Sequence, residues 1–241
     1  MTKLDLNADL GESWYGNTIG NDAGLMPLLD SCNIACGFHG GDAITMRLTI
    51  ELALEHGVAI GAHPSFPDRK NFGRKIMEIP SPDLFALMLY QISALKGMTE
   101  GLGGSVHHVK PHGALYHFLN GSISGAEAFV RAAAKSNIPI IYGPPTGQLR
   151  VMTEFHGLEF WPEGFADRAY EPSLHLRSRQ KDGACLNDTS MAVEQVRLLQ
   201  SGKVRATDGK VYPIEVKTVC LHGDHPGATD RALAIRQLFN T

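Results

Sequence analysis

The 241-residue sequence has little of what marks membrane, secreted or nucleic-acid-binding proteins. No stretch approaches the roughly 18 uninterrupted apolar residues that a membrane span needs. The first residues lack the apolar core of a signal peptide. The 22 basic residues against 25 acidic ones give a net charge of −3, whereas nucleic-acid binders usually carry a basic stripe. We therefore expect no membrane and no nucleic acid as partner.

Cysteine is scarce, and several catalytic motifs are missing. The four cysteines form no CxxC pair, which favours reduced thiols in a cytoplasmic protein. The sequence contains no GxxxxGK[ST] phosphate loop and no GxSxG nucleophile motif. Neither P-loop nucleotide binding nor catalysis by a nucleophilic serine is therefore indicated.

What the sequence does contain is an alternation of short apolar runs with longer stretches of helical period. Because helices separate the strands and no linker divides the chain, we predict one α/β domain over residues 1–241, a seven-stranded parallel (β/α) barrel. A doubly wound open sheet is the alternative. The predicted strands are 4–9, 33–37, 59–63, 107–110, 138–142, 158–165 and 218–222.

Local signals also place several helices and one hairpin. Predicted helices cover 44–56 and 228–239, and a third begins at Ser81-Pro82 with Ser81 as its N-cap. A fourth follows Asn187-Asp188, with Met191, Val196 and Leu199 on its inner face. The stretch 208–214 is predicted to be a small hairpin inserted before the last strand.

Polar residues near the carboxyl ends of the strands favour the barrel, in which these ends converge on one face. In the first strand Asp5, Asn7 and Asp9 alternate, so all three point into the barrel. Buried acids need partners, and we expect a functional role for Asp9 and a structural one for Asp5. After the second strand come His39 and Asp42, although Asp42 could instead cap the next helix.

The third strand ends at His63, which Asp68 and Arg69 follow, either as a surface ion pair or as substrate contacts. On the fourth strand His108 and Lys110 fall on one side, and His112 joins them if the strand continues. A lysine among histidines is a source of a general base or of an anion-binding group.

The last two strands end in further histidine and aspartate. Asp167 and Arg168 close the sixth strand, and His222 and Asp224 close the seventh. Histidine mixed with carboxylate suits either a divalent metal such as Zn²⁺, Mn²⁺ or Ni²⁺ or acid–base catalysis without metal.

Six segments together resemble the LamB/YcsF family. They are residues 7–12 (NADLGE), 33–39 (NIACGFH), 61–69 (GAHPSFPDR), 109–116 (VKPHGALY), 165–168 (FADR) and 218–224 (TVCLHGD). They follow the family's order and cover essentially the whole chain. Arg179, four residues before Gly183-Ala184, resembles a family arginine and is a candidate for holding an anion.

The resemblance implies a barrel of the glycoside hydrolase/deacetylase type. It also implies ATP-dependent opening of 5-oxo-L-proline to L-glutamate, with ADP and phosphate released, by a 5-oxoprolinase that contains partner subunits B and C. Because the chain has no phosphate loop, ATP binds either at the barrel mouth or chiefly on the partners. The chain can also form homo-oligomers in this scheme. The predicted catalytic residues are Asp9, His39, His63, Lys110, His112, Asp167 and His222, and the predicted substrate-binding residues are Asn7, Asp42, Asp68, Arg69, Arg168, Arg179 and Asp224.

Two other hypotheses stay open at this point. One is a metal-dependent hydrolase similar to polysaccharide deacetylases, with Asp9, His39 and His63 as ligands of a divalent metal. The other is a non-catalytic component that binds substrate and delivers it to a partner enzyme.

Overall fold

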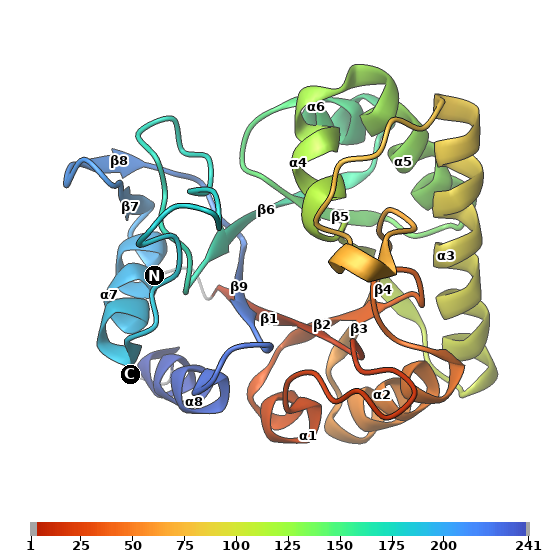
Figure 1. Ribbon diagram of the computed structural model, residues 1–241, viewed down its shortest axis with the longest axis horizontal. Helices are drawn as coiled ribbons and strands as arrows, with labels where there is room; N and C mark the ends of the chain where they lie inside the picture. Colours follow the sequence, from red (N-terminus) through yellow and green to blue (C-terminus); the bar gives the residue numbers. More distant parts are fainter. Residues whose placement is uncertain (1–3, 240–241) are drawn as a thin grey trace.

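The computed structural model describes residues 4–239, and at its centre seven parallel strands close into a barrel (Figure 1). Strands that follow one another in the sequence pair side by side, and the last one returns to pair with the first. The predicted parallel barrel is confirmed, and residues 1–3 and 240–241 of the predicted domain lie outside the described ones. The strands are β1 (Asp5–Leu10), β2 (Ser31–Ala35), β3 (Ala59–His63), β4 (Val106–Val109), β5 (Ile140–Gly143), β6 (Glu159–Phe165) and β9 (Thr218–His222).

Helices surround the barrel, with α3 and α7 on opposite sides of it (Figure 1). Across residues 4–239, no helix combines the length and the apolar character needed to cross a membrane. The α-helices are α1 (Asp22–Leu25), α2 (Ala43–His56), α3 (Ser81–Gly101), α4 (Gly113–Gly121), α5 (Ile123–Lys135), α6 (Gln148–Phe155), α7 (Thr189–Gln200) and α8 (Ala228–Phe239), and two 3₁₀ turns are η1 (Met26–Leu28) and η2 (Arg69–Asn71).

Alternation along the first strand separates an apolar outside from a polar inside. On β1, Leu6 and Ala8 are fully buried among the apolar residues between barrel and helices. Asn7 and Asp9 point the other way, and both contact the amide of Asn33 inside the barrel. The period-two prediction for the first strand is therefore confirmed, and the polar interior leads up to the carboxyl ends of the strands.

Three local predictions need correction. On α7, Val196 and Leu199 are buried as predicted, but Met191 is half exposed because the buried stripe begins one position later, at Ala192. The hairpin starts before residue 208, since β7 (Lys203–Arg205) pairs antiparallel with β8 (Val211–Pro213). Helix α3 takes Pro80 as its N-cap and has no side-chain cap, so the predicted capping role of Ser81 is wrong.

Candidate active site

A cavity of about 520 Å³ opens at the carboxyl ends of the barrel strands. This is the face on which barrel enzymes build their sites. Eight of the predicted residues line it together, and Glu12, which the sequence analysis did not select, is a ninth. The eight are Asp9, His63, Lys110, His112, Arg168, Arg179, His222 and Asp224.

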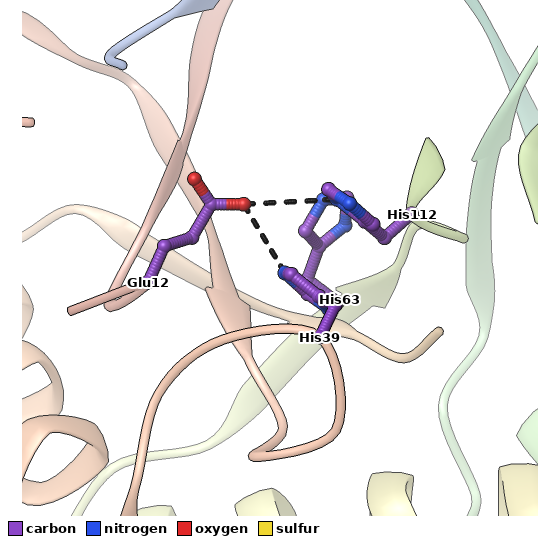
Figure 2. A group of neighbouring side chains, drawn as sticks. All are labelled: Glu12, His39, His63 and His112. Atoms are coloured by element: carbon purple, nitrogen blue, oxygen red, sulfur yellow. Dashed lines mark hydrogen bonds and ion pairs between the residues drawn. The ribbon is translucent and has the colours of Figure 1, made fainter. Parts of the chain in front are cut away.

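Beside the cavity, Glu12, His39, His63 and His112 form a buried cluster that could hold a metal ion, and we call it the His/Glu quartet (Figure 2). Their candidate ligand atoms all lie within 4.8 Å of one another. The four residues come from the ends of β1, β2, β3 and β4 in turn. Figure 2 shows the side chains converging, and the rings of His39 and His112 stack with centroids 3.6 Å apart.

Glycine allows the loop that carries His39 to approach β1 this closely. A Cβ atom at Gly40 would lie 2.8 Å from the carbonyl oxygen of Glu12, and one at Gly41 would lie 2.7 Å from that of Gly11. Gly41 also has a φ of +75°, which disfavours other residues. The two glycines therefore allow the close approach in which Nε2 of His39 lies 3.1 Å from Oε1 of Glu12.

Hydrogen bonds to carbonyl groups fix the protonation pattern of two of these rings. Nδ1 of His63 lies 2.8 Å from the Lys110 carbonyl, and Nε2 of His112 lies 2.9 Å from the Phe72 carbonyl. Carbonyls only accept, so these nitrogens carry hydrogen. In neutral rings His63 Nε2 and His112 Nδ1, 3.0 Å apart, would then face each other as bare acceptors. This pair requires positive charge, either a proton on one ring or a cation.

The electrostatics of the quartet agree with a cation site. Burial, together with neighbouring histidines, holds the pKa of His39 and of His112 well below the usual range. Burial and the nearby Asp9 carboxylate raise the pKa of Glu12 well above its usual range. Nδ1 of His39 is buried without a hydrogen-bond partner. Neutral imidazoles with one carboxylate form a donor set that suits Zn²⁺ and related divalent ions.

Asp9 belongs to a different group, centred on the ammonium of Lys110. Lys110 Nζ lies 2.9 Å from Asp9 Oδ1, 2.8 Å from Glu163 Oε1 and 3.1 Å from Cys220 Sγ. Burial opposes the charge of Lys110, but Asp9 and its other anionic neighbours outweigh it, so its pKa stands well above the usual range. Asp9 reaches the quartet only through His63, at 3.3 Å. Of the predicted metal ligands, His39 and His63 therefore belong to the quartet and Asp9 lies beside it, whereas Glu12 and His112 complete the quartet.

A third group joins Asp167 to His222. The Asp167 carboxylate lies 3.0 Å from Nδ1 of His222 and also accepts the backbone N–H of His222. Burial opposes ionisation of Asp167, but His222 outweighs it and holds the pKa of Asp167 below its usual range. Because Nδ1 faces Asp167, the other ring nitrogen of His222 is left for the cavity.

Arginine side chains surround the mouth of the cavity. Arg74 forms an ion pair with Asp224 at 2.9 Å. Arg179 contacts His225 at 3.1 Å, and within residues 4–239 it forms no ion pair. It is therefore the better placed of the two to take an anionic group from a ligand.

Five predicted residues have other positions or uses. Asn7 lies inside the barrel, bonded to Glu163 and Thr218. Arg168 lines the cavity, but its guanidinium donates to the carbonyls of Ala184 and Arg177. The other three stand outside the cavity lining: Asp42 caps α2 through Thr45, Asp68 caps η2 through Asn71, and Arg69 donates to the carbonyls of Gly37 and Gly41.

Residues that the sequence analysis missed have weak signals in the sequence. Glu12 lies within a motif already singled out, three positions after Asp9, where the chain has left the strand. Glu163 sits on an apolar strand, and the period of two that places Phe165 inward also turns Glu163 inward. Tyr116, a further residue in the lining of the cavity, lies in helix α4, where its hydrophobic neighbours suggest core packing.

With this geometry established, comparison with known proteins gives consistent results. The model of the LamB/YcsF family matches residues 4–241. The chain is 42% identical over 241 residues to a Bacillus cytotoxicus protein named as the A subunit of 5-oxoprolinase, covering 99% of this chain and 96% of the other. A Methylococcus capsulatus protein of the same name is 45% identical, with 97% and 90% covered. The crystal structure of a lactam utilization protein from Thermus thermophilus superposes with a TM-score of 0.92, at 38% identity, and covers 99% of this chain and 96% of its own.

Proposed function

This chain belongs to the LamB/YcsF family, and we propose that it is the A subunit of an ATP-dependent 5-oxoprolinase that opens 5-oxo-L-proline to L-glutamate. One observation carries the proposal. The buried acid–base groups gather at one cavity, in a chain that matches proteins named as the A subunit of 5-oxoprolinase over nearly its whole length. We place the activity in the cytoplasm, which the four free cysteines support.

The chemistry needs ATP because a lactam is an unreactive amide. Transfer of the ATP γ-phosphoryl group to the ring carbonyl oxygen releases ADP and activates the carbon. Water then attacks that carbon, and the ring nitrogen leaves once it is protonated. A second water hydrolyses the resulting γ-glutamyl phosphate to L-glutamate and phosphate. The site must therefore supply a base, an acid and positive charge for the phosphoryl group.

The described residues offer each of these roles. His222, held by Asp167, presents a ring nitrogen to the cavity and is our candidate base. Lys110 supplies a buried positive charge, and Arg179 supplies one at the mouth. Asp9 keeps the Lys110 ammonium and the His63 ring in place. The chain lacks a phosphate loop, so we assign ATP to the cavity mouth, close to subunits B and C.

The His/Glu quartet fits a divalent cation, since two of its nitrogens face each other and a third has no partner. Glu12, His39, His63 and His112 would hold it. A cation bound there would polarise a water or a carbonyl oxygen at the cavity edge. The same quartet is the observation that favours the second candidate, a metal-dependent hydrolase that acts without ATP.

The test is glutamate formation from 5-oxo-L-proline by this chain mixed with B and C subunits, with and without ATP. We expect an ATP-dependent signal that His39→Ala abolishes. His56→Ala, which changes an exposed histidine at the end of α2, is the matched control and should keep full activity. No glutamate from a folded, assembled mixture would contradict the proposal. Metal-dependent deacetylation of a polysaccharide by the isolated chain without ATP would instead support the metal-dependent hydrolase.

A further inference from the structure

A smaller pocket of about 170 Å³ adjoins the main cavity, and we call it the side pocket. The two share Tyr116, His117, Phe165 and Leu176 in their walls. The side pocket runs between the end of α4 and the loop after β5, and it reaches down to Glu163 on β6. Its volume is roughly that of six water molecules in the liquid, enough for part of a small ring.

The side pocket is lined by buried polar atoms. Glu163 Oε2 and Asn120 Oδ1 have no hydrogen-bond partner of normal geometry among the described residues, and the Tyr116 hydroxyl lies close enough to the Glu163 carboxylate to interact with it. Glu163 is 0% exposed and Tyr116 is 5% exposed. Buried polar groups in native proteins are nearly always bonded, and leaving one unbonded is costly. The Tyr116 hydroxyl has a single hydrogen to donate, so it cannot satisfy both Glu163 Oε2 and Asn120 Oδ1, and a ligand that donates hydrogen bonds would complete this set.

The chemistry of these atoms defines that ligand. A carboxylate oxygen and an amide oxygen only accept hydrogen bonds, and a hydroxyl can accept as well. Burial and the nearby Glu163 raise the pKa of Tyr116 well above its usual range, so its hydroxyl stays neutral. The other oxygen of Glu163 is already taken by Lys110 at 2.8 Å and by Asn7 at 3.1 Å, which leaves Oε2 as an acceptor for the side pocket. A ligand group that carries N–H fits this surface, whereas an ether or ester oxygen does not.

We propose that the side pocket binds the lactam N–H of the substrate, and that Glu163 and Tyr116 are specificity-determining residues for it. The inference depends on the function proposed above. Lys110 bridges Glu163 to Asp9, which lines the main cavity. In the lactam the carbonyl carbon is bonded directly to the nitrogen. A lactam ring that donates its N–H to Glu163 therefore has its carbonyl group near Lys110. The amine formed when the ring opens then contacts the same acceptor atoms of the side pocket.

The decisive variant is Glu163→Gln, which preserves shape. Lys110 and Asn7 are both donors, so they hold the amide oxygen of the new glutamine at the Oε1 position and turn its NH₂ toward the side pocket. A donor then faces the lactam N–H. The matching ligand is the ring-oxygen analogue of 5-oxo-L-proline, a lactone carboxylate that has an acceptor in place of the N–H.

The measurement is the dissociation constant of each compound for the assembled complex, by calorimetry without ATP. We expect the unmodified complex to bind the lactam at least tenfold more tightly than the lactone. Glu163→Gln should remove or reverse this preference, and Tyr116→Phe should reduce it severalfold. Tyr212→Phe, which removes a hydroxyl on β8 bonded only to Asp208, is the control and should leave it unchanged.

Two results would overturn the inference: equal binding of both compounds by the unmodified complex, or a preference that persists in Glu163→Gln and Tyr116→Phe. If glutamate still forms in either case, the proposed function stands and only the side-pocket assignment is wrong. If the lactam does not bind and no glutamate forms, the proposed function itself fails and the inference fails with it.

Discussion

The two ends of the barrel interior both contain buried acids and histidines, yet they differ in how these are bonded. At the amino end, Asp5 accepts hydrogen bonds from the hydroxyls of Ser31 and Thr218. Deeper in the barrel His108 bonds Asn33 at 2.7 Å and stacks on Tyr142. Burial raises the pKa of Asp5 to about 6 and holds that of His108 well below its usual range. Both groups are therefore stabilised in their neutral forms.

At the carboxyl end the same residue types are left incomplete. Oε2 of Glu163 and Nδ1 of His39 have no hydrogen-bond partner of normal geometry among the described residues. The facing nitrogens of His63 and His112 require a positive charge. Lys110 is kept charged between two carboxylates. Buried polar groups with complete bonding serve the fold, whereas groups left incomplete beside a cavity are available to ligands.

The largest expected effect comes from Lys110→Met. It removes the ammonium and leaves the Asp9 and Glu163 carboxylates buried without their cation. We expect a loss of about 3–5 kcal/mol in the free energy of unfolding. We also expect glutamate formation to fall by about 10²–10³-fold. Urea denaturation and the coupled activity assay measure the two effects.

Lys217→Met is the matched control, since Lys217 pairs with Glu159 at 2.9 Å on the surface, with both side chains about half exposed. Its expected loss is below about 1 kcal/mol, with activity unchanged. Equal effects of the two substitutions would contradict the distinction between interior and surface charge.

The next effect concerns the His/Glu quartet. Glu12→Gln keeps the size of the side chain and removes its charge. Because Glu12 is itself a candidate ligand, we expect the affinity of the chain for Zn²⁺ to fall by at least about 100-fold, the upper end of what loss of a residue that only supports a ligand costs. Competition with a chelating dye measures the dissociation constant. Asp9→Asn should have a smaller effect, because Asp9 stands outside the quartet. Glu51→Gln, on the exposed face of α2, should have none. A larger loss of Zn²⁺ affinity in Asp9→Asn than in Glu12→Gln would instead support the ligands predicted from the sequence, which are Asp9, His39 and His63.

The last effect concerns the stability of the amino end and depends on pH. Asp5 titrates near pH 6 in the folded protein and near 4 when unfolded, so its neutral form favours folding. The free energy of unfolding should therefore fall as pH rises from about 4 to about 6, by up to about 3 kcal/mol. Asp5→Asn removes this fall. The free energy of unfolding of the variant, relative to that of the unmodified protein, should therefore rise across that range. Urea denaturation of both proteins at pH 4.5 and pH 7 measures the effect. If the difference in free energy of unfolding between Asp5→Asn and the unmodified protein is the same at both pH values, the assignment is refuted.

Much of the fold could be predicted because strand and helix periods are local properties of the sequence. The alternation of Leu6 and Ala8 with Asn7 and Asp9 fixed which side of β1 faces inward, before any partner strand was known. Met191 shows the limit, since one turn of a helix offers several stripes and only packing selects one. Residues after a strand, such as Glu12, follow no period and were missed for that reason.

The sequence alone determined the alternation of parallel strands with helices and the polar face of the first strand, and it favoured a barrel in which histidine and aspartate converge at one end. Each follows from periods of 2 and 3.6 and from the common direction of the strands. Only the tertiary structure decided that Glu12 joins the histidines and that Asp9 pairs with Lys110. It also decided that Glu163 contacts Lys110 with one carboxylate oxygen and lines the side pocket. The reason is that hydrogen-bond partners come from strands far apart in the sequence, and their distances are set by closure of the barrel.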